Sequence, residues 1–201
     1  MLDVFLNLLL LSSNLKEKIL DIAYKHFIQF GFAKTTLTGI AMAIGKKKTS
    51  LYYYFKDKED LFASIVRVEA DNLLSELEKL FKKSNSEIDI LKKYISERIR
   101  MMHVVSVRYA VLKDELFLLL PEIERVRLPF HQKEVLLVKG VLDKGIQNGV
   151  FSEMNTEHVA GILVNTLKGL EIPMYVRSEV KYDPKEIEGL TNLLIYGLAK
   201  N

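Results

Sequence analysis

The sequence predicts an all-α protein with a three-helix N-terminal part and a larger helical body, about nine helices in all. Apolar residues recur at steps of three and four along nearly the whole chain, which is the period of an amphipathic helix. Its 201 residues include only 4 prolines and 10 glycines, fewer turn formers than a many-stranded fold needs. We find no convincing strand pattern and no internal repeat.

The first predicted helix begins at about Leu15 and ends at Gly31, a typical helix-stop residue. Asn14 can cap its N-terminus, and Glu17 stands in the capping-box position three residues later. Its apolar stripe comprises Ile19, Ile22, Ala23, Phe27 and Phe30.

Two short helices and one long helix follow. Thr36 can cap a helix over residues 37–44, and Gly45 closes it. The next helix begins at Lys47 or Lys48 and ends near Tyr54. Asp57 then caps a helix that keeps its apolar period to about residue 83, long enough to join two parts of the molecule.

The remaining helices are delimited by their prolines, glycines and capping residues. Pro121 is expected to stop one helix and Pro129 to open another, which Asn148 and Gly149 end. The predicted ranges are 87–107, 109–120, 129–148, 155–176 (capped by Asn155 or Thr156) and 184–199 (with Pro184 in its first turn).

Composition excludes several classes of function. With no cysteine, the chain has no disulfide framework, no thiol catalysis and no cysteine-ligated metal. The residues show no Ser/His/Asp set, no matched carboxylate pair, no glycine-rich phosphate loop and no metal constellation. We therefore expect no enzyme activity, no cofactor and no metal ion.

Residues 1–14 form an apolar N-terminal extension. Leu2 to Leu11 are too few to span a bilayer, no lysine or arginine precedes them, and no cleavage site follows. We expect no membrane partner. We expect either a helical extension packed on the body or a start codon assigned too far upstream, and a signal peptide, whose apolar part the segment resembles, is the less favoured alternative.

The small net charge of +3 is unevenly distributed. Residues 15–58 hold nine lysines and three acidic residues, an excess of six positive charges, and the rest of the chain is slightly acidic. Lys46, Lys47 and Lys48 lie between two short helices, next to hydroxyl and phenol donors. Such groups suit phosphate oxygens and base edges, which points to a helix-turn-helix that contacts DNA.

The same residues resemble a known family. A first helix that ends in Phe27-Ile28-Gln29-Phe30-Gly31-Phe32 leads to Thr35-Thr36-Leu37, Ile40-Ala41 and Gly45, and then to Leu51-Tyr52-Tyr53-Tyr54-Phe55 and Lys58-Glu59-Asp60-Leu61. This pattern is similar to the signature of the TetR family of transcriptional regulators over about residues 16–63. The resemblance implies a helix-turn-helix DNA-binding domain at 15–60 and a ligand-binding and dimerisation domain at 61–201.

The resemblance also implies which side chains contact DNA. Lys46 and Lys47 depart from the family pattern, which has a small apolar residue and a Ser or Thr cap there, so the turn is more basic and its cap weaker. The expected DNA-binding residues are Thr36, Thr38, Lys46, Lys47, Lys48, Thr49, Ser50, Tyr52, Tyr53 and Lys58.

Family members bind a small molecule in the body and dimerise through their last two helices. The expected ligand-binding residues, suited to a small apolar or aromatic effector, are Met101, Met102, His103, Tyr109, Phe117, Phe130, Met174 and Tyr175. The expected dimer interface comprises Val159, Ile162, Leu163, Thr166, Leu167, Leu170, Leu190, Leu194 and Gly197. Core packing within the monomer is the alternative for both sets.

Together these expectations describe a cytoplasmic, ligand-responsive repressor that binds double-stranded DNA as a homodimer on a pseudo-palindromic operator. The alternative is a DNA-binding structural or interaction protein of the same fold, without ligand-controlled release.

Overall fold

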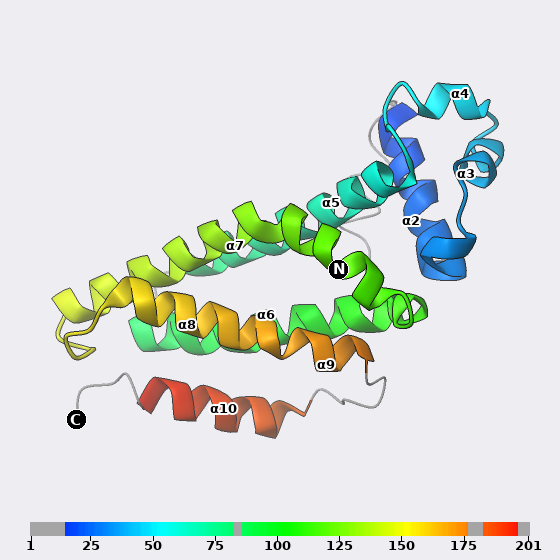
Figure 1. Cartoon of the computed structure of the whole chain (residues 1–201). Helices are drawn as coiled ribbons and strands as arrows, with labels where there is room; N and C mark the ends of the chain where they lie inside the picture. The colour runs from blue at the N-terminus through cyan, green and yellow to red at the C-terminus, as the bar shows by residue number, and fades with distance from the viewer. Residues whose placement is uncertain (1–14, 83–85, 177–182, 197–201) are drawn as a thin grey trace. The chain divides into compact units, whose positions relative to one another are not determined.

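The computed structural model describes residues 15–82, 86–176 and 183–196, and its regular elements are helices, which confirms the all-α prediction (Figure 1). The chain folds into two compact units. The first unit contains Tyr109–Val126 together with the described residues before Glu69, and the second unit contains Glu69–Arg108 together with the described residues from Arg127 onward.

The first unit is built around α2 (Leu15–Lys34), which contacts α3 (Leu37–Ala43) and the short 3-10 helix η1 (Ala110–Leu112). α3 in turn contacts α4 (Lys48–Leu51), and the long helix α5 (Lys58–Phe81) begins in this unit. The rings of Phe27, Phe32 and Phe62 pack against one another, with centroids 5.3 to 5.7 Å apart. These buried aromatic rings pack α2 against the first part of α5.

The chain breaks its helical path at Gly31, where the sequence predicts the end of the first helix. Gly31 has φ 83° and ψ 174°, a conformation that L side chains rarely adopt, and one further turn to Lys34 follows. Glu115 satisfies the amides exposed by the break: its Oε2 accepts from the Phe32 amide at 2.6 Å and its Oε1 from the Ala33 amide at 2.8 Å. A carboxylate distant in sequence therefore stabilises this bend.

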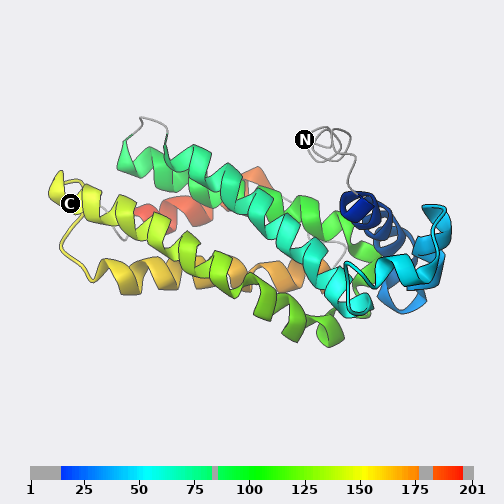
Figure 2. The ribbon, with the colours of Figure 1, turned by 90° about the horizontal axis from the view of Figure 1, so that it is seen from above.

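The second unit consists of the later part of α5 and of α7 (Leu116–Gln147), with α6 (Glu87–Arg108), α8 (Thr156–Gly169), α9 (Glu171–Val176) and α10 (Pro184–Tyr196). α6 contacts α8, α9 and α10, and Figure 2 shows these helices from above. The core comprises large apolar side chains of these helices, among them Leu77, Leu91, Ile95, Leu142, Leu163 and Leu167.

Two predicted boundaries in the middle of the chain are wrong. Residues 109–120 do not form one helix that Pro121 stops, because η1 is followed by a turn and α7 then runs through both Pro121 and Pro129. Each proline removes one helical hydrogen bond. The helix continues because its inward face is buried on both sides of each proline, at Leu119, Val126 and Val138. The predicted helix over 155–176 is likewise divided, into α8 and α9, at Leu170.

The predicted caps at Thr36, Asp57 and Asn155 are confirmed: each side chain accepts a hydrogen bond from the backbone amide three residues later. The predicted extension at 1–14, with the Asn14 cap, lies outside the described residues. The functional domain boundaries 15–60 and 61–201 stay predictions. None of the helices in the described part of the chain is long and apolar enough to cross a membrane.

Candidate nucleic-acid interface and effector site

The turn between α3 and α4 is held by backbone hydrogen bonds. The Gly45 amide donates to Met42 O at 3.0 Å and the Lys46 amide donates to Ala41 O at 2.8 Å. Gly45 has φ 68°, the left-handed conformation that ends α3 without steric strain. Lys47 is the N-cap of α4, and its side chain makes no capping bond, as the departure from the family pattern predicts.

Almost all the predicted DNA-binding side chains of the turn and of α4 lie on the surface. Lys46, Lys47, Lys48 and Thr49 are exposed and Ser50 is half-buried, whereas Leu51 at the end of α4 is fully buried. α4 thus has a buried anchor and a cationic, hydroxyl-bearing outer surface.

Two tyrosines extend this outer surface beyond α4. Tyr53 is 88% exposed and Tyr52 is 48% exposed, with the Lys48 ammonium 5.4 Å from the Tyr52 ring. Thr36 and Thr38 on the α3 side are also exposed. The two tyrosines and the two threonines therefore add hydroxyl groups to the exposed lysines of this surface, and its contact with DNA stays a prediction.

Lys58 has a different environment from the other predicted DNA-binding residues. Its ammonium donates to Phe32 O at 2.8 Å and lies 4.2 Å from the centroid of the Phe32 ring. The side chain therefore ties the start of α5 to the last turn of α2. Its predicted contact with a DNA phosphate would require this bond to break or to be shared.

The predicted ligand-binding residues are divided between the two units. Tyr109 and Phe117 belong to the first unit, where Tyr109 packs edge-on against Tyr24 and Phe117 is 66% exposed. Met101, His103, Met174 and Tyr175 are half-buried in the second unit, and Met102 is buried. Of the eight, only Phe130 lines the cavity that the second unit contains. A ligand role for the set stays a prediction.

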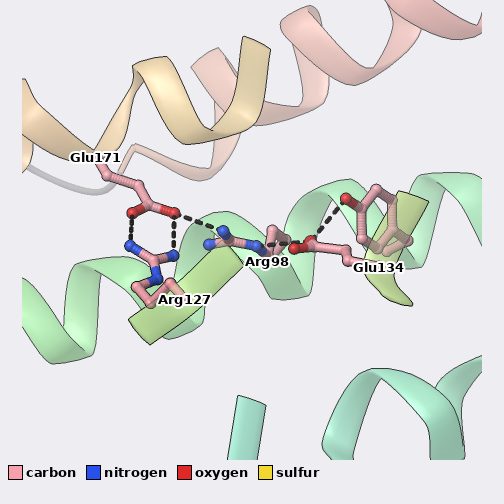
Figure 3. Close-up of polar contacts among 5 residues, drawn as sticks. Arg98, Arg127, Glu134 and Glu171 are labelled. Atoms are coloured by element: carbon pink, nitrogen blue, oxygen red, sulfur yellow. Dashed lines mark hydrogen bonds and ion pairs between the residues drawn. The ribbon is translucent and has the colours of Figure 1, made fainter. Parts of the chain in front are cut away.

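Sequence reasoning missed a buried ion-pair cluster in the second unit, made by Arg98, Arg127, Glu134 and Glu171 (Figure 3). Arg98 donates from Nε to Glu134 at 2.8 Å and from Nη2 to Glu171 at 2.5 Å. Arg127 donates both terminal nitrogens to Glu171, and Tyr94 donates its hydroxyl to Glu134 at 2.8 Å. The apolar residues around Arg98 and Glu134 have the ordinary spacing of an amphipathic helix, which does not predict an ion pair. The only signal in the sequence was the presence of a charged residue on the buried face of each helix.

The pKa values of the cluster follow from its burial and its pairing. Burial by itself raises the pKa of Glu171, but Arg98 and Arg127 outweigh it, so the net pKa is lowered. Burial and the neighbouring Glu134 raise the pKa of Tyr94. The glutamate is therefore ionised and the tyrosine is a neutral hydrogen-bond donor at neutral pH.

The predicted dimer residues divide into two groups. Leu163 and Leu167 are buried in the core of their own subunit, whereas Ile162 is 65% exposed and Thr166 is exposed on the other side of α8. Val159, Leu170, Leu190 and Leu194 are half-buried, and Gly197 lies outside the described residues. The interface stays a prediction, with the two core leucines unavailable to a partner.

Comparison with known proteins agrees with this geometry. Residues 19–65 match the family model described as bacterial regulatory proteins, tetR family. The chain is 37% identical over 86 residues to the HTH-type transcriptional regulator RutR of Escherichia coli K12, and 36% identical over 85 residues to the biofilm operon negative regulator IcaR of Staphylococcus aureus. The matched segment is 43% and 42% of this chain, and 40% and 46% of the two relatives.

The likeness to a solved structure extends further along the chain. A transcriptional regulator from Cytophaga hutchinsonii matches with a TM-score of 0.71 and 27% identity, over 90% of this chain and 97% of the other. Residues 19–65 therefore match the tetR family of bacterial regulatory proteins, and the chain as a whole shares its fold with a solved transcriptional regulator.

Proposed function

We propose that this protein is a transcriptional repressor that binds DNA as a homodimer and is released by a small molecule. The observation that carries the proposal is the outer surface of α4 and its turn, where Lys46, Lys47, Lys48, Tyr52 and Tyr53 are exposed around a buried leucine. IcaR, one of the relatives, is named as a negative regulator, which favours repression over activation.

The residue types of this surface suit both kinds of DNA contact. Lysine ammonium groups neutralise phosphates, and this term dominates affinity and makes it salt-dependent. Thr49, Ser50 and Tyr52 supply hydroxyl groups that can reach base edges in the major groove. We expect the lysines to supply most of the affinity and the hydroxyl groups most of the selectivity.

A homodimer would present two such surfaces to successive major grooves, about 34–36 Å apart. Ile162 and Leu193, exposed by 65% and 72% on α8 and α10, are apolar side chains that a second copy would cover. The effector would act by favouring one arrangement of the DNA-binding domains, and α5, which carries residues of both units, is the element to transmit the change. A cytoplasmic location and the absence of enzyme activity follow from the proposal.

The test is DNA binding by fluorescence anisotropy at two salt concentrations, with the DNA upstream of its own coding sequence and with a random duplex of equal length. Lys48→Ala should weaken binding to both and reduce the salt slope by about one. Lys113→Ala removes the same charge from an exposed position on η1's flank and serves as the matched control. Equal affinity for the two duplexes would refute sequence-specific repression.

A further inference from the structure

Two charged side chains hold the last turn of α2 from opposite sides. The Glu115 carboxylate accepts hydrogen bonds from the Phe32 amide at 2.6 Å and the Ala33 amide at 2.8 Å, and the Lys58 ammonium donates to Phe32 O at 2.8 Å. The peptide group that joins Phe32 to Ala33 is therefore bonded to an ammonium at its oxygen and to a carboxylate at its nitrogen. The two bonds polarise this group in the same sense, so each strengthens the other. We call these four residues the clasp.

The clasp lies where the backbone leaves α2 and enters α3. Gly31, directly before it, has φ 83°, and an added Cβ there would lie 3.3 Å from Oε2 of Glu115. Thr35, which is 1% exposed, donates its hydroxyl to Gly31 O at 2.7 Å, and Thr36 then caps α3. Only Lys34 and Thr35 separate the clasp from this cap, so the direction in which the chain enters α3 depends on the clasp.

The clasp also joins the ends of three helices. Lys58 is the first residue of α5, and Glu115 directly precedes α7 and accepts the Leu119 amide at its backbone oxygen. The Phe32 side chain completes the contact, because its ring centroid lies 4.2 Å from the Lys58 ammonium and 5.4 Å from the ring centroid of Phe62 on α5. Loss of either charged side chain would therefore loosen the end of α2 from the start of α5 or of α7, and with it the chain that enters α3.

We propose that Lys58 and Glu115 are positioning residues, which hold α3 and α4 in the arrangement that binds DNA. The proposal rests on the proposed function, because it assigns two residues that DNA binding needs and that act without touching DNA. If only a fraction of the molecules held this arrangement, the apparent Kd would rise by the inverse of that fraction. Such a loss removes no phosphate contact, so it is independent of salt concentration. Because α5 and α7 continue into the second unit, the clasp also joins both helices to the chain that leads into α3.

The sign of the effect of one substitution tests the proposal. Removing an acidic residue strengthens binding to polyanionic DNA by electrostatics alone, whereas loss of positioning weakens it. We therefore expect Glu115→Ala to weaken binding to both duplexes of the anisotropy experiment by about tenfold, with an unchanged salt slope. Asp114→Ala removes the same charge from the exposed neighbouring residue and is the matched control, with unchanged or slightly tighter binding. Wild-type or tighter binding by Glu115→Ala would overturn the proposal.

A double variant tests whether the two residues act together. Lys58→Met should also weaken DNA binding by about tenfold with an unchanged salt slope, since its ammonium is bonded within the clasp. Both side chains act on the same peptide group, so Glu115→Ala combined with Lys58→Met should weaken binding by far less than the product of the two single effects. A double effect equal to that product would show independent contributions and overturn the clasp. A salt slope reduced by about one in Lys58→Met would place the ammonium on a phosphate and overturn its positioning role.

Amide hydrogen exchange separates positioning from a general loss of stability. The Ile40 amide in the first turn of α3 and the Lys46 amide in the α3–α4 turn should exchange about tenfold faster in Glu115→Ala, a larger factor than for the amide of the buried Leu167 in α8. Equal factors in the two units would show only global destabilisation and overturn the proposal. Glu115→Gln keeps one acceptor oxygen and should show smaller changes of the same kind, so it takes the place of the alanine variant if that variant does not fold.

The two duplexes separate this inference from the proposed function. Equal affinity of the wild-type protein for both duplexes would refute the repressor, while weaker binding of Glu115→Ala to the random duplex would still support the clasp. Preferential binding to the upstream duplex that Glu115→Ala leaves unchanged would overturn the clasp and leave the repressor proposal standing. If the wild-type protein binds neither duplex, the repressor is refuted, and the exchange rates at Ile40 and Lys46 decide the positioning role.

Discussion

Replacing Gly145 of α7 by alanine should destabilise the protein, whereas replacing Gly140 of the same helix by alanine should stabilise it. A Cβ at Gly145 would lie 2.1 Å from Cδ2 of Phe151, which is 2% exposed in the core of the second unit. The Val150 and Phe151 amides both donate to the Gly145 carbonyl, at 2.8 and 3.1 Å, so the ring cannot simply swing away. At Gly140, also in α7, an added Cβ would meet nothing within 4 Å.

The magnitudes follow from two opposing effects. Alanine in place of a helical glycine raises the free energy of unfolding by about 1 kcal/mol, and Gly140→Ala should show this gain. Overpacking a core costs about 1–3 kcal/mol, so Gly145→Ala should lie below Gly140→Ala by that amount. For a chain of this size, the gap corresponds to about 2–12 °C in Tm.

Thermal unfolding by circular dichroism at one fixed protein concentration measures the gap, since an oligomer's Tm depends on concentration. A second arm places Gly145→Ala in a Phe151→Leu background, where the smaller side chain relieves the clash. In this background, alanine at position 145 should be neutral or stabilising. The difference between its effects in the two backgrounds measures the interaction between positions 145 and 151. Equal Tm values for Gly140→Ala and Gly145→Ala would refute the reasoning.

Three further predictions concern the polar contacts. Glu115→Ala should lower the free energy of unfolding by about 1–3 kcal/mol, because it leaves the Phe32 and Ala33 amides without acceptors. Glu115→Gln keeps one acceptor oxygen and should recover part of this loss. Urea titrations measure both effects. Lys58→Met should lower Tm and leave the salt slope of DNA binding unchanged, since the ammonium is bonded to Phe32 O; a slope reduced by about one would instead place Lys58 on a phosphate. The lowered pKa of Glu171 means that its pairing stabilises the fold above the unfolded-state value of about 4.3 and that this stability is lost as the pH falls below it. Urea titrations from pH 7 to pH 3 should show this loss, and Glu171→Gln should be less stable at pH 7 by about 3–5 kcal/mol and have a flatter acid limb.

The first unit was largely predictable because its signals are local. Thr36 and Asp57 cap helices through bonds to amides three residues later, and Gly45 adopts a backbone angle that its residue type allows. Such features depend on a few neighbouring residues, so sequence reading finds them. The path of α7 was not predictable in this way, because burial of its inward face outweighs the local effects of Pro121 and Pro129.

Contacts between residues that are far apart in the chain could not be predicted from the sequence. Arg98 meets Glu134 and Glu171 across 36 and 73 residues, and no spacing rule links them. Lys58 carries the charge expected of a DNA contact, yet its environment is decided by a carbonyl 26 residues earlier. Similarly, only the packing of α8 distinguishes the buried Leu163 and Leu167 from the exposed Ile162.

The bond between Glu115 and the bend at Gly31 has a consequence for how the protein is made and for how it can be recombined. The Phe32 and Ala33 amides donate to a carboxylate that lies more than 80 residues later in the chain. The first unit therefore cannot complete its fold during synthesis until residue 115 has left the ribosome. A chimaera that exchanges only residues 15–60 between regulators would also separate the bend from its acceptor. A functional graft of this DNA-binding domain should therefore carry residues 109–126 along with it.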